Sequence, residues 1–229
     1  MKRDERRAAT RLALADSALR LFTGQGVEAT TVEEIAAGAG VSPRTFFLHF
    51  PAKAAAVFPD HEANLARFRA GLAELPEDGD DVAAVCRLMV ESIRVQAPSQ
   101  FRRGRYALVA TSEAVRDLDA RTDRDYEDAV SAHLVSRWGE DAQSVLAAQA
   151  VANVVLGIAR AALIAWGRDG LDPVTSASAL FRRLAGSPLG GLADDLRPAP
   201  APERRSRMEQ DGNGGPCAAS GGGRPWTPG

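Results

Sequence analysis

Apolar residues recur every three or four positions along most of the first 185 residues, which is the period of an amphipathic α-helix. No stretch alternates apolar and polar side chains over several positions, as a half-buried β-strand would. The pattern therefore predicts an all-α protein. We expect helices at about residues 5–23, 53–75 with a break near Pro59, 81–96, 99–103, 106–117, 123–138, 142–166 and 172–185.

The pattern of helices and the composition divide the chain into three parts. Residues 1–53 are expected to form a small N-terminal helical domain, and residues 54–185 a larger one. From Gly186 onward, Gly, Pro, Ser and charged residues dominate. Such a composition buries too little apolar surface to offset the entropy of an ordered chain. We expect residues 186–229 to be a disordered tail.

Within the segment 30–53, residues near Thr31 have the pattern that starts a short helix. Thr31 and Glu34 have the spacing of a capping box. In this motif the side chain of each residue accepts a hydrogen bond from the backbone N–H of the other. Thr30 and Glu33 share that spacing, so the helix begins at one of two adjacent positions. Three apolar residues then follow at helical spacing: Val32, Ile35 and Ala36.

A turn and a second helix follow directly. Gly40 suits a sharp turn because glycine accepts a positive φ. Ser42 is a good N-cap, and Pro43 stands at the first helical position, where its missing N–H costs nothing. An ordinary capped hairpin would have similar caps, but the order of these features favours a helix-turn-helix, whose second helix reads a DNA major groove.

This segment resembles the DNA-binding domain of the tetracycline-repressor (TetR) family of one-component bacterial regulators. The Ser-Pro-Arg-Thr-Phe-Phe form is similar to a branch common in high-GC actinobacteria. The residues that match the family pattern are Gly26, Thr30, Thr31, Val32, Ile35, Ala36, Ala39, Gly40, Val41, Ser42, Thr45, Phe46, Phe47, Phe50 and Lys53.

The resemblance implies roles for particular side chains. Arg44 and Thr45 would face base edges, since Arg is the commonest reader of guanine and the Thr methyl can meet a thymine methyl. Phe46 and Phe50 would anchor the small core. The residues implied to hold phosphates, or helix N-termini near them, are Thr30, Thr31, Ser42, His49 and Lys53.

Some of these roles have alternatives. Thr31 and Ser42 could serve as helix caps alone. Phe47 belongs to the predicted DNA-binding face but stands where many family members have Tyr, so it lacks a hydroxyl for a phosphate. His49 also replaces a Tyr of most members; either it donates to a phosphate or it lies on the helix surface.

Charge and composition narrow the functional class. The formal net charge is −2, which argues against a protein coated in nucleic acid. Basic residues crowd the N-terminus, where they form either an arm that reaches the DNA backbone or minor groove or a solvated end: Lys2, Arg3, Arg6, Arg7 and Arg11.

The sequence indicates a cytoplasmic protein with no membrane partner. We find no run of about 18 apolar residues that would span a membrane. The charged N-terminus lacks the apolar region of a signal peptide. Cys86 and Cys217 are too few for a disulfide framework, and Cys86 lies in an apolar helical pattern typical of a buried thiol.

The resemblance implies that the larger domain binds a ligand and dimerises. Residues 142–166 and 172–185 would form a four-helix bundle with a second subunit, although the first could instead be the central helix of a monomer. The implied mechanism is a population shift, in which a ligand moves the connecting helix and changes the separation of two DNA-binding domains on a near-palindromic operator. Repression relieved by ligand is the family's usual mode.

A pocket for the effector would lie among the middle helices. Its expected lining is mostly apolar and suits a hydrophobic effector such as an acyl-CoA or another amphiphile. Any of these side chains could instead be ordinary core or surface. The candidates are Phe68, Leu72, Met89, Ile93, Phe101, Tyr106, Val109 and Leu156, with Arg105 and Asn153 as polar anchors.

Catalytic and metal-binding motifs do not stand out in the sequence. His49, His61 and His133 lie outside any HExxH or paired ligand spacing, and no GxSxG elbow or phosphate-binding loop occurs. We therefore expect no enzyme, no metal and no cofactor. Two other functions stay open: a helical ligand-binding protein without operator activity, and a helical-bundle enzyme.

Overall fold

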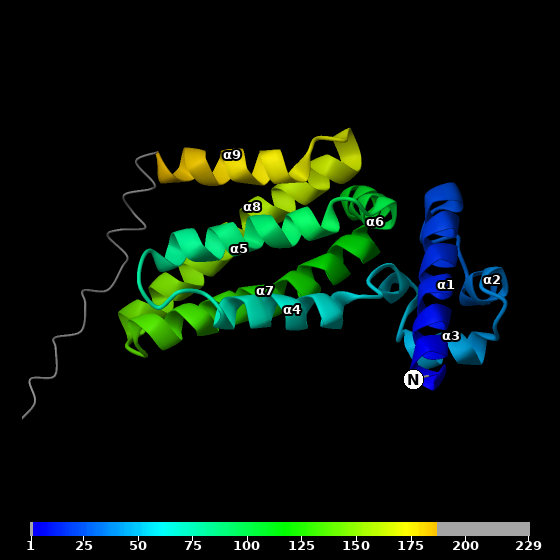
Figure 1. The fold of residues 1–229 in the computed structure, drawn as a ribbon. Helices are drawn as coiled ribbons and strands as arrows, with labels where there is room; N and C mark the ends of the chain where they lie inside the picture. Colours follow the sequence, from blue (N-terminus) through cyan, green and yellow to red (C-terminus); the bar gives the residue numbers. More distant parts are fainter. Residues whose placement is uncertain (1, 187–229) are drawn as a thin grey trace, which may run out of the picture. The chain divides into compact units, whose positions relative to one another are not determined.

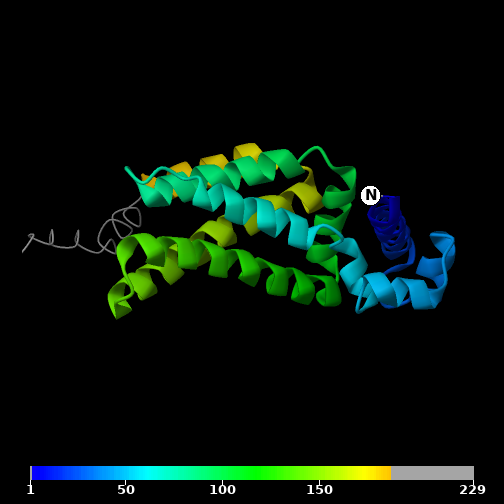
Figure 2. The same cartoon turned by 60° about the horizontal axis from the view of Figure 1, so that its bottom comes forward.

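The computed structural model describes residues 2–186, and within this range every regular element is helical (Figures 1 and 2). The prediction of an all-α fold is confirmed. The predicted tail, residues 187–229 with Cys217, lies outside the described residues.

The first three helices share a small apolar core. They are α1 (Lys2–Gln25), α2 (Val32–Gly38) and α3 (Pro43–His49). Their apolar faces meet through fully or almost fully buried side chains: Leu14, Ala18, Phe22, Ile35, Ala36, Phe46 and Phe50. This core fixes how α3 is held against α1 and α2.

The rest of the described chain is a bundle of longer helices. A short 3₁₀-helix η1 (Lys53–Val57) leads to α4 (His61–Ala73), α5 (Asp81–Gln96), α6 (Gln100–Thr111), α7 (Glu113–Trp138), α8 (Ala142–Asp169) and α9 (Pro173–Ala185). In Figures 1 and 2, α4, α5, α7, α8 and α9 lie alongside one another, and α6 lies at the end of this bundle next to α1. Contacts of α6 with α1, α7 and α8 join the two groups of helices.

One expected break is confirmed and another is corrected. The connecting segment predicted at 53–75 is broken near Pro59 as expected, and it consists of η1 and α4, separated by Phe58, Pro59 and Asp60. Proline lacks an N–H donor and disfavours a helical residue before it, so the break is complete. The predicted junction between 117 and 123 is instead continuous helix within α7. The chain breaks at Ser112, whose backbone is extended, with φ −110° and ψ 126°.

The helix α8 also extends further than expected, to Asp169. By length and composition alone it could cross a membrane, which corrects the expectation that no such segment exists. The core helix of a soluble protein meets the same description. Here α8 packs against α6, α7 and α9, and its buried side chains include Ala148, Ala152, Val155 and Ala159.

The crossing of α6 and α8 is very close at Gly167. A Cβ atom at this position would overlap the backbone of Tyr106 and Ala107. The rings of Tyr106 and Trp166 lie beside this crossing, with centroids 6.3 Å apart. Only glycine lets the two helices approach this closely.

We therefore expect Gly167→Ala to lower the free energy of unfolding by about 1–3 kcal/mol, because the added methyl forces the two backbones apart. Gly24→Ala is the matched control, since a Cβ at Gly24 in α1 would meet nothing within 4 Å. This control should be neutral or stabilising by up to about 1 kcal/mol, because alanine favours the helix. Urea denaturation of both variants measures the difference; equal effects would contradict the close crossing.

Candidate functional site

The start of α2 is fixed by a complete capping box. Thr31 Oγ1 accepts a hydrogen bond from the Glu34 N–H at 3.2 Å, and Glu34 Oε2 accepts one from the Thr31 N–H at 2.8 Å. Thr31 is therefore the N-cap, and the helix begins at Val32 rather than one residue earlier.

The turn and the start of α3 are fixed in the same way. Gly40 has φ +69°, and the N–H of Val41 donates to the carbonyl of Ala36 at 2.9 Å. Ser42 Oγ accepts from the Thr45 N–H at 3.2 Å, and Pro43 occupies the first turn. Local sequence signals thus set the direction of α3.

The outer face of α3 combines charge with exposed apolar surface. Phe46 is fully buried, whereas Phe47 and Leu48 are 58% and 68% exposed. The Arg44 side chain is exposed on the same short helix, and Thr45 is half-buried. Large apolar side chains beside an exposed Arg are typical of a contact surface.

Two of the predicted phosphate-binding residues are used inside the domain. Thr30 is 1% exposed, and its hydroxyl donates to the carbonyl of Gly26 at 2.7 Å, so it does not face solvent. Lys53 Nζ donates to the carbonyls of Glu28 and Thr30, at 3.0 and 2.8 Å. Lys53 therefore ties η1 to the loop before α2. Thr31 and Ser42 stay exposed as caps.

Arg11, which was expected either in a basic arm or at a solvated end, instead fastens α1 to the end of α3 and to the linker between η1 and α4, residues 58–60. It donates to the carbonyls of His49 and Pro59, at 2.5 and 2.7 Å, and its guanidinium lies 4.4 Å from the centre of the Phe50 ring. Three other basic side chains of α1, Arg3, Arg6 and Arg7, line a cleft beside the end of α3. The other residues of this cleft are Asp4, Thr10, Leu48 and His49.

The structure does not decide between the two roles predicted for His49, a phosphate contact and a place on the helix surface. Its ring is partly buried, and Nδ1 has no hydrogen-bond partner among the described residues. Burial, and then the charges of Arg11 and Arg7, lowers the pKa of His49. A neutral imidazole at the edge of the basic cleft follows.

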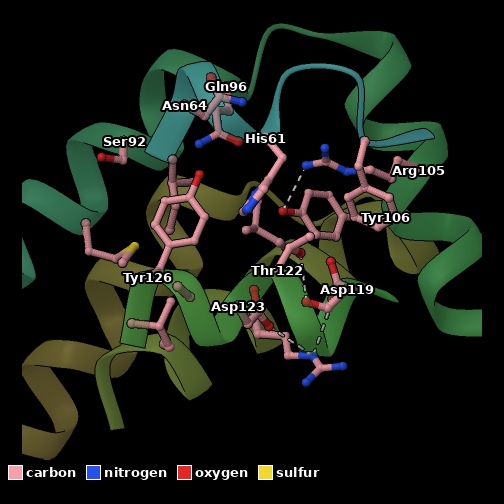
Figure 3. Close-up of a pocket in the computed structure, with 17 residues that line it drawn as sticks. His61, Asn64, Ser92, Gln96, Arg105, Tyr106, Asp119, Thr122, Asp123 and Tyr126 are labelled. Atoms are coloured by element: carbon pink, nitrogen blue, oxygen red, sulfur yellow. Dashed lines mark hydrogen bonds and ion pairs between the residues drawn. The ribbon is translucent and has the colours of Figure 1, made fainter. Parts of the chain in front are cut away.

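A second feature is a small pocket enclosed by α4, α5, α6, α7 and α8 (Figure 3). The cavity volume is about 60 Å³. Five of the residues predicted to line a pocket do so: Met89, Ile93, Arg105, Tyr106 and Leu156.

The other predicted pocket residues lie elsewhere. Phe68 lines a neighbouring groove between α4 and α5, and Leu72 and Val109 are buried in the core. Phe101 is half-buried outside the pocket. Asn153 is exposed, because the buried stripe of α8 passes through Ala152 and Val155 and leaves it on the outer face.

The lining is more polar than the sequence indicated. An apolar wall of Phe58, Met89, Ile93, Leu156, Ala159 and Leu163 faces side chains that sequence reasoning missed: His61, Asn64, Ser92, Gln96, Asp119, Thr122, Asp123, Tyr126 and Arg160. The signal in α7 was a pair of carboxylates four residues apart, but charges at helical spacing are usually solvated. Within residues 2–186, no group of three or more His, Cys, Asp or Glu could hold a metal ion.

One arginine is shared by two carboxylates of α7. Arg160 Nε lies 3.5 Å from Asp119 Oδ2 and 3.6 Å from Asp123 Oδ2. Burial, and then the charge of Asp119, raises the pKa of Asp123 from 3.8 to about 7. The pocket thus holds one carboxyl group that changes its protonation near neutral pH.

The other polar cluster joins the pocket to the linker. Arg105 is buried, its Nη2 donates to Tyr106 Oη at 3.1 Å, and its Nη1 lies 3.7 Å from Asp60 Oδ1. Asp60 is the residue before α4, and it also forms an ion pair with Arg102. Arg102 in turn bonds Asn64 and Gln96, so it connects α6 with α4 and α5.

The raised pKa of Asp123 predicts a pH effect on stability. The folded state holds a proton that the unfolded state releases, so this carboxyl lowers stability as the pH rises from about 4 to about 7. Asp123→Asn should therefore gain stability relative to the unaltered protein across this window, by up to about 1.4 kcal/mol per pH unit.

Urea denaturation at several pH values checks this effect. Asp128→Asn, an exposed carboxyl on the same helix, is the control and should show no such rise. Parallel stability curves for Asp123→Asn and the unaltered protein would contradict the assignment.

Known proteins match this chain in the sequence of its helix-turn-helix segment and in its overall fold. The family described as bacterial regulatory proteins, tetR family, matches residues 14–57. Over 44 residues the chain is 57% identical to the HTH-type transcriptional regulator TcmR of Streptomyces glaucescens, a match that covers 19% of this chain and 20% of that regulator. The matched segment is thus about a fifth of the relative's length.

Solved structures share the fold over most of their length. NalD, the secondary repressor of the MexAB-OprM multidrug efflux pump in Pseudomonas aeruginosa, aligns with a TM-score of 0.54 and 19% identity, covering 80% of this chain and 96% of NalD. FadR of Bacillus subtilis, in complex with stearoyl-CoA, aligns with a TM-score of 0.52 and 16% identity, covering 75% and 96%. Residues 14–57 thus match the tetR family of bacterial regulatory proteins, and the chain shares the fold of these solved regulators over most of their length.

Proposed function

We propose that this protein is a sequence-specific DNA-binding transcriptional regulator, a repressor that binds a near-palindromic operator as a dimer and is released by a small-molecule effector. The observation that carries the proposal is the outer face of α3. Arg44, Phe47 and Leu48 are exposed on a helix whose caps and core fix its direction. The names of TcmR and NalD, a regulator and a repressor, support it.

In this proposal Arg44 and Thr45 read base edges, and Phe47 and Leu48 supply apolar contact with thymine methyls or sugars. Thr31 and Ser42, exposed at the starts of α2 and α3, remain candidates for phosphate contacts. Thr30 and Lys53 act indirectly, by holding the loop that positions α2.

The basic cleft beside α3 supplies further phosphate contacts. Arg3, Arg6 and Arg7 are exposed on α1, and the cleft that they line also contains His49. A neutral imidazole with a free Nδ1 can still donate through Nε2. Because the cleft borders α3, a duplex in contact with α3 would bring its backbone near these side chains.

A second copy of the chain is the proposed partner of α8 and α9. Large apolar side chains are exposed on these helices and on the loop between them: Val145, Leu146, Val154, Leu171 and Leu180. A groove between α8 and α9 is lined by Ala161, Ala165 and Ala179, whose small side chains allow another helix to approach closely. Two copies would place two α3 helices on successive major grooves.

The effector would act on the start of α4. A cavity of about 60 Å³ is far smaller than the roughly 300–1,000 Å³ of ordinary ligand pockets, so a bound effector must widen it. Arg105 lines the pocket and also faces Asp60. Movement of Arg105 or α4 would therefore disturb the linker, whose Pro59 carbonyl is bound by Arg11 of α1.

This route couples the pocket to the DNA-binding helices as a population shift. The effector needs only to bind one arrangement of α4 and α6 more tightly than the other. A repressor of this kind works in the cytoplasm, where it meets chromosomal DNA.

The proposal is tested by titrating the full chain against a fluorescent fragment of its own upstream DNA, at two salt concentrations and with random DNA as competitor. We expect specific binding that weakens with salt. Arg44→Ala should lower the preference for operator over random DNA about 10- to 100-fold, because a reader of base edges is lost.

The control is Arg69→Ala, which removes an exposed Arg on α4 and should keep the preference. Equal weakening on operator and random DNA for Arg44→Ala would contradict base reading by this residue. If the fragment and a selection from the whole genome both yield no specific site, the chain is a helical ligand-binding protein without operator activity.

The dimer predicts a clear effect of Leu180→Asp. In a two-fold interface every substitution occurs twice, so the new charges lie across the same apolar contact. We expect this variant to sediment as a monomer at micromolar concentration, whereas the unaltered protein sediments as a dimer. Val95→Asp, on the exposed face of α5, is the control and should remain dimeric. Monomeric unaltered protein would refute the interface.

A further inference from the structure

Two buried polar atoms in the pocket lack hydrogen bonds among the described residues, and they are of opposite kinds. Arg105 Nε is a donor, and Asp119 Oδ2 is an acceptor. The two residues are only 5% and 2% exposed. An unsatisfied buried donor or acceptor is costly, so each requires a physical explanation.

Neither atom has a hydrogen-bond partner among the described residues, although Asp119 Oδ2 forms an ion pair with Arg160. Arg105 donates a hydrogen bond to Tyr106 through Nη2 and faces Asp60 through Nη1. Its Nε has no hydrogen-bond partner among the described residues. Asp119 Oδ2 lies 3.5 Å from Arg160 without the geometry of a hydrogen bond. Both residues line the same pocket.

The two groups lie on the same side of the pocket. In Figure 3, Arg105 and Asp119 flank Tyr106, while Asn64 and Gln96 lie at the top of the view and Ser92 at the opposite side. Burial raises the pKa of Asp119, and the nearby positive charge of Arg105 partly opposes this rise. A single polar end of a ligand could meet both.

The charged side chains around this end already have partners. Arg105 faces Asp60, and Arg160 faces Asp119 and Asp123. A charged ligand would add an uncompensated charge to a buried site, which is unfavourable unless it is paired. Neutral ligands leave the existing ion pairs in place.

The remaining wall is apolar. Met89 and Ile93 of α5, Leu156 and Leu163 of α8, and Phe58 line the pocket with the polar groups. A ligand without a polar end would pack against this wall but leave Arg105 Nε and Asp119 Oδ2 without hydrogen bonds. Sites built around such groups reject analogues that lack the matching group.

We propose that this pocket selects a neutral ligand with an apolar body and a polar end, such as a hydroxyl, that accepts a hydrogen bond from Arg105 Nε and donates one to Asp119 Oδ2. This inference rests on the proposed function in one respect: it takes the ligand of this pocket to be the effector that releases the repressor. Binding itself does not require DNA.

The experiment compares four single-ring probes of similar size by calorimetry on the full chain: phenol, toluene, benzoate and benzylammonium. They carry a neutral hydroxyl, no polar group, a negative charge and a positive charge. We expect phenol to bind at least about tenfold more tightly than each of the others, since its hydroxyl can both donate and accept.

Variants then assign the preference to the two residues. Asp119→Ala and Arg105→Ala should each reduce the ratio of phenol to toluene affinity by about tenfold. Asp128→Ala and Arg103→Ala remove exposed charges from the same helices and should leave it unchanged. The four-probe ranking on the unaltered protein needs no variant, so it holds even if an altered chain fails to fold.

Each other outcome overturns the proposal. Toluene equal to phenol would refute the polar end, and tighter binding of benzoate or benzylammonium would refute neutrality. No binding of any probe at 10 mM, on the order of the weakest affinities that a fragment-sized ligand shows, would refute the pocket as a site for such a ligand. DNA titration is a separate measurement, so loss of operator binding would leave this result intact.

Discussion

The contact that joins the pocket to the start of α4 is the double ion pair of Asp60. This carboxylate precedes α4 and faces Arg102 and Arg105, both of α6. One residue earlier, the carbonyl of Pro59 accepts a hydrogen bond from Arg11 of α1. Two adjacent residues at the break between η1 and α4 are therefore bound by two different helices. Any displacement of α4 must break or move these charged contacts, which makes the break a natural point of coupling.

The pocket and the linker share Arg105, and this arrangement limits how the protein can respond to a ligand. Arg105 is buried and cannot lose its partners without finding others, because an unpaired buried charge is strongly unfavourable. A ligand that engages its Nε changes the balance between Asp60, Tyr106 and the pocket. Arg102 adds a second tie, since it connects α4, α5 and α6 around the same opening. Charge in this part of the core costs stability and favours a small number of discrete arrangements.

The helix α6 packs closely against a helix on each of two sides. At its crossing with α8, a Cβ on Gly167 would overlap the backbone of Tyr106 and Ala107. Leu19 of α1 packs close to Gly104 of α6, where a Cβ would lie 3.1 Å from a Leu19 methyl. The helix that carries Arg102 and Arg105 is thus held between α1 and α8. By contrast, α4 is bounded by a non-helical segment at each end, and charged contacts to α6 hold its start.

The sequence by itself determined the helical period, a capping box at one of two adjacent positions, the Ser42–Pro43 start of α3 and the positive φ of Gly40, because each depends on neighbours within four residues. The break near Pro59 was also predictable, but the boundary at Ser112 was not, because no Pro or Gly ends the helix there. Only the tertiary structure decided the inward hydroxyl of Thr30, the exposed position of Asn153, and the meeting of Arg105 with Asp60 and Asp119. Those contacts join residues from different helices, and whether a charge is solvated or buried follows from the packing of all of them.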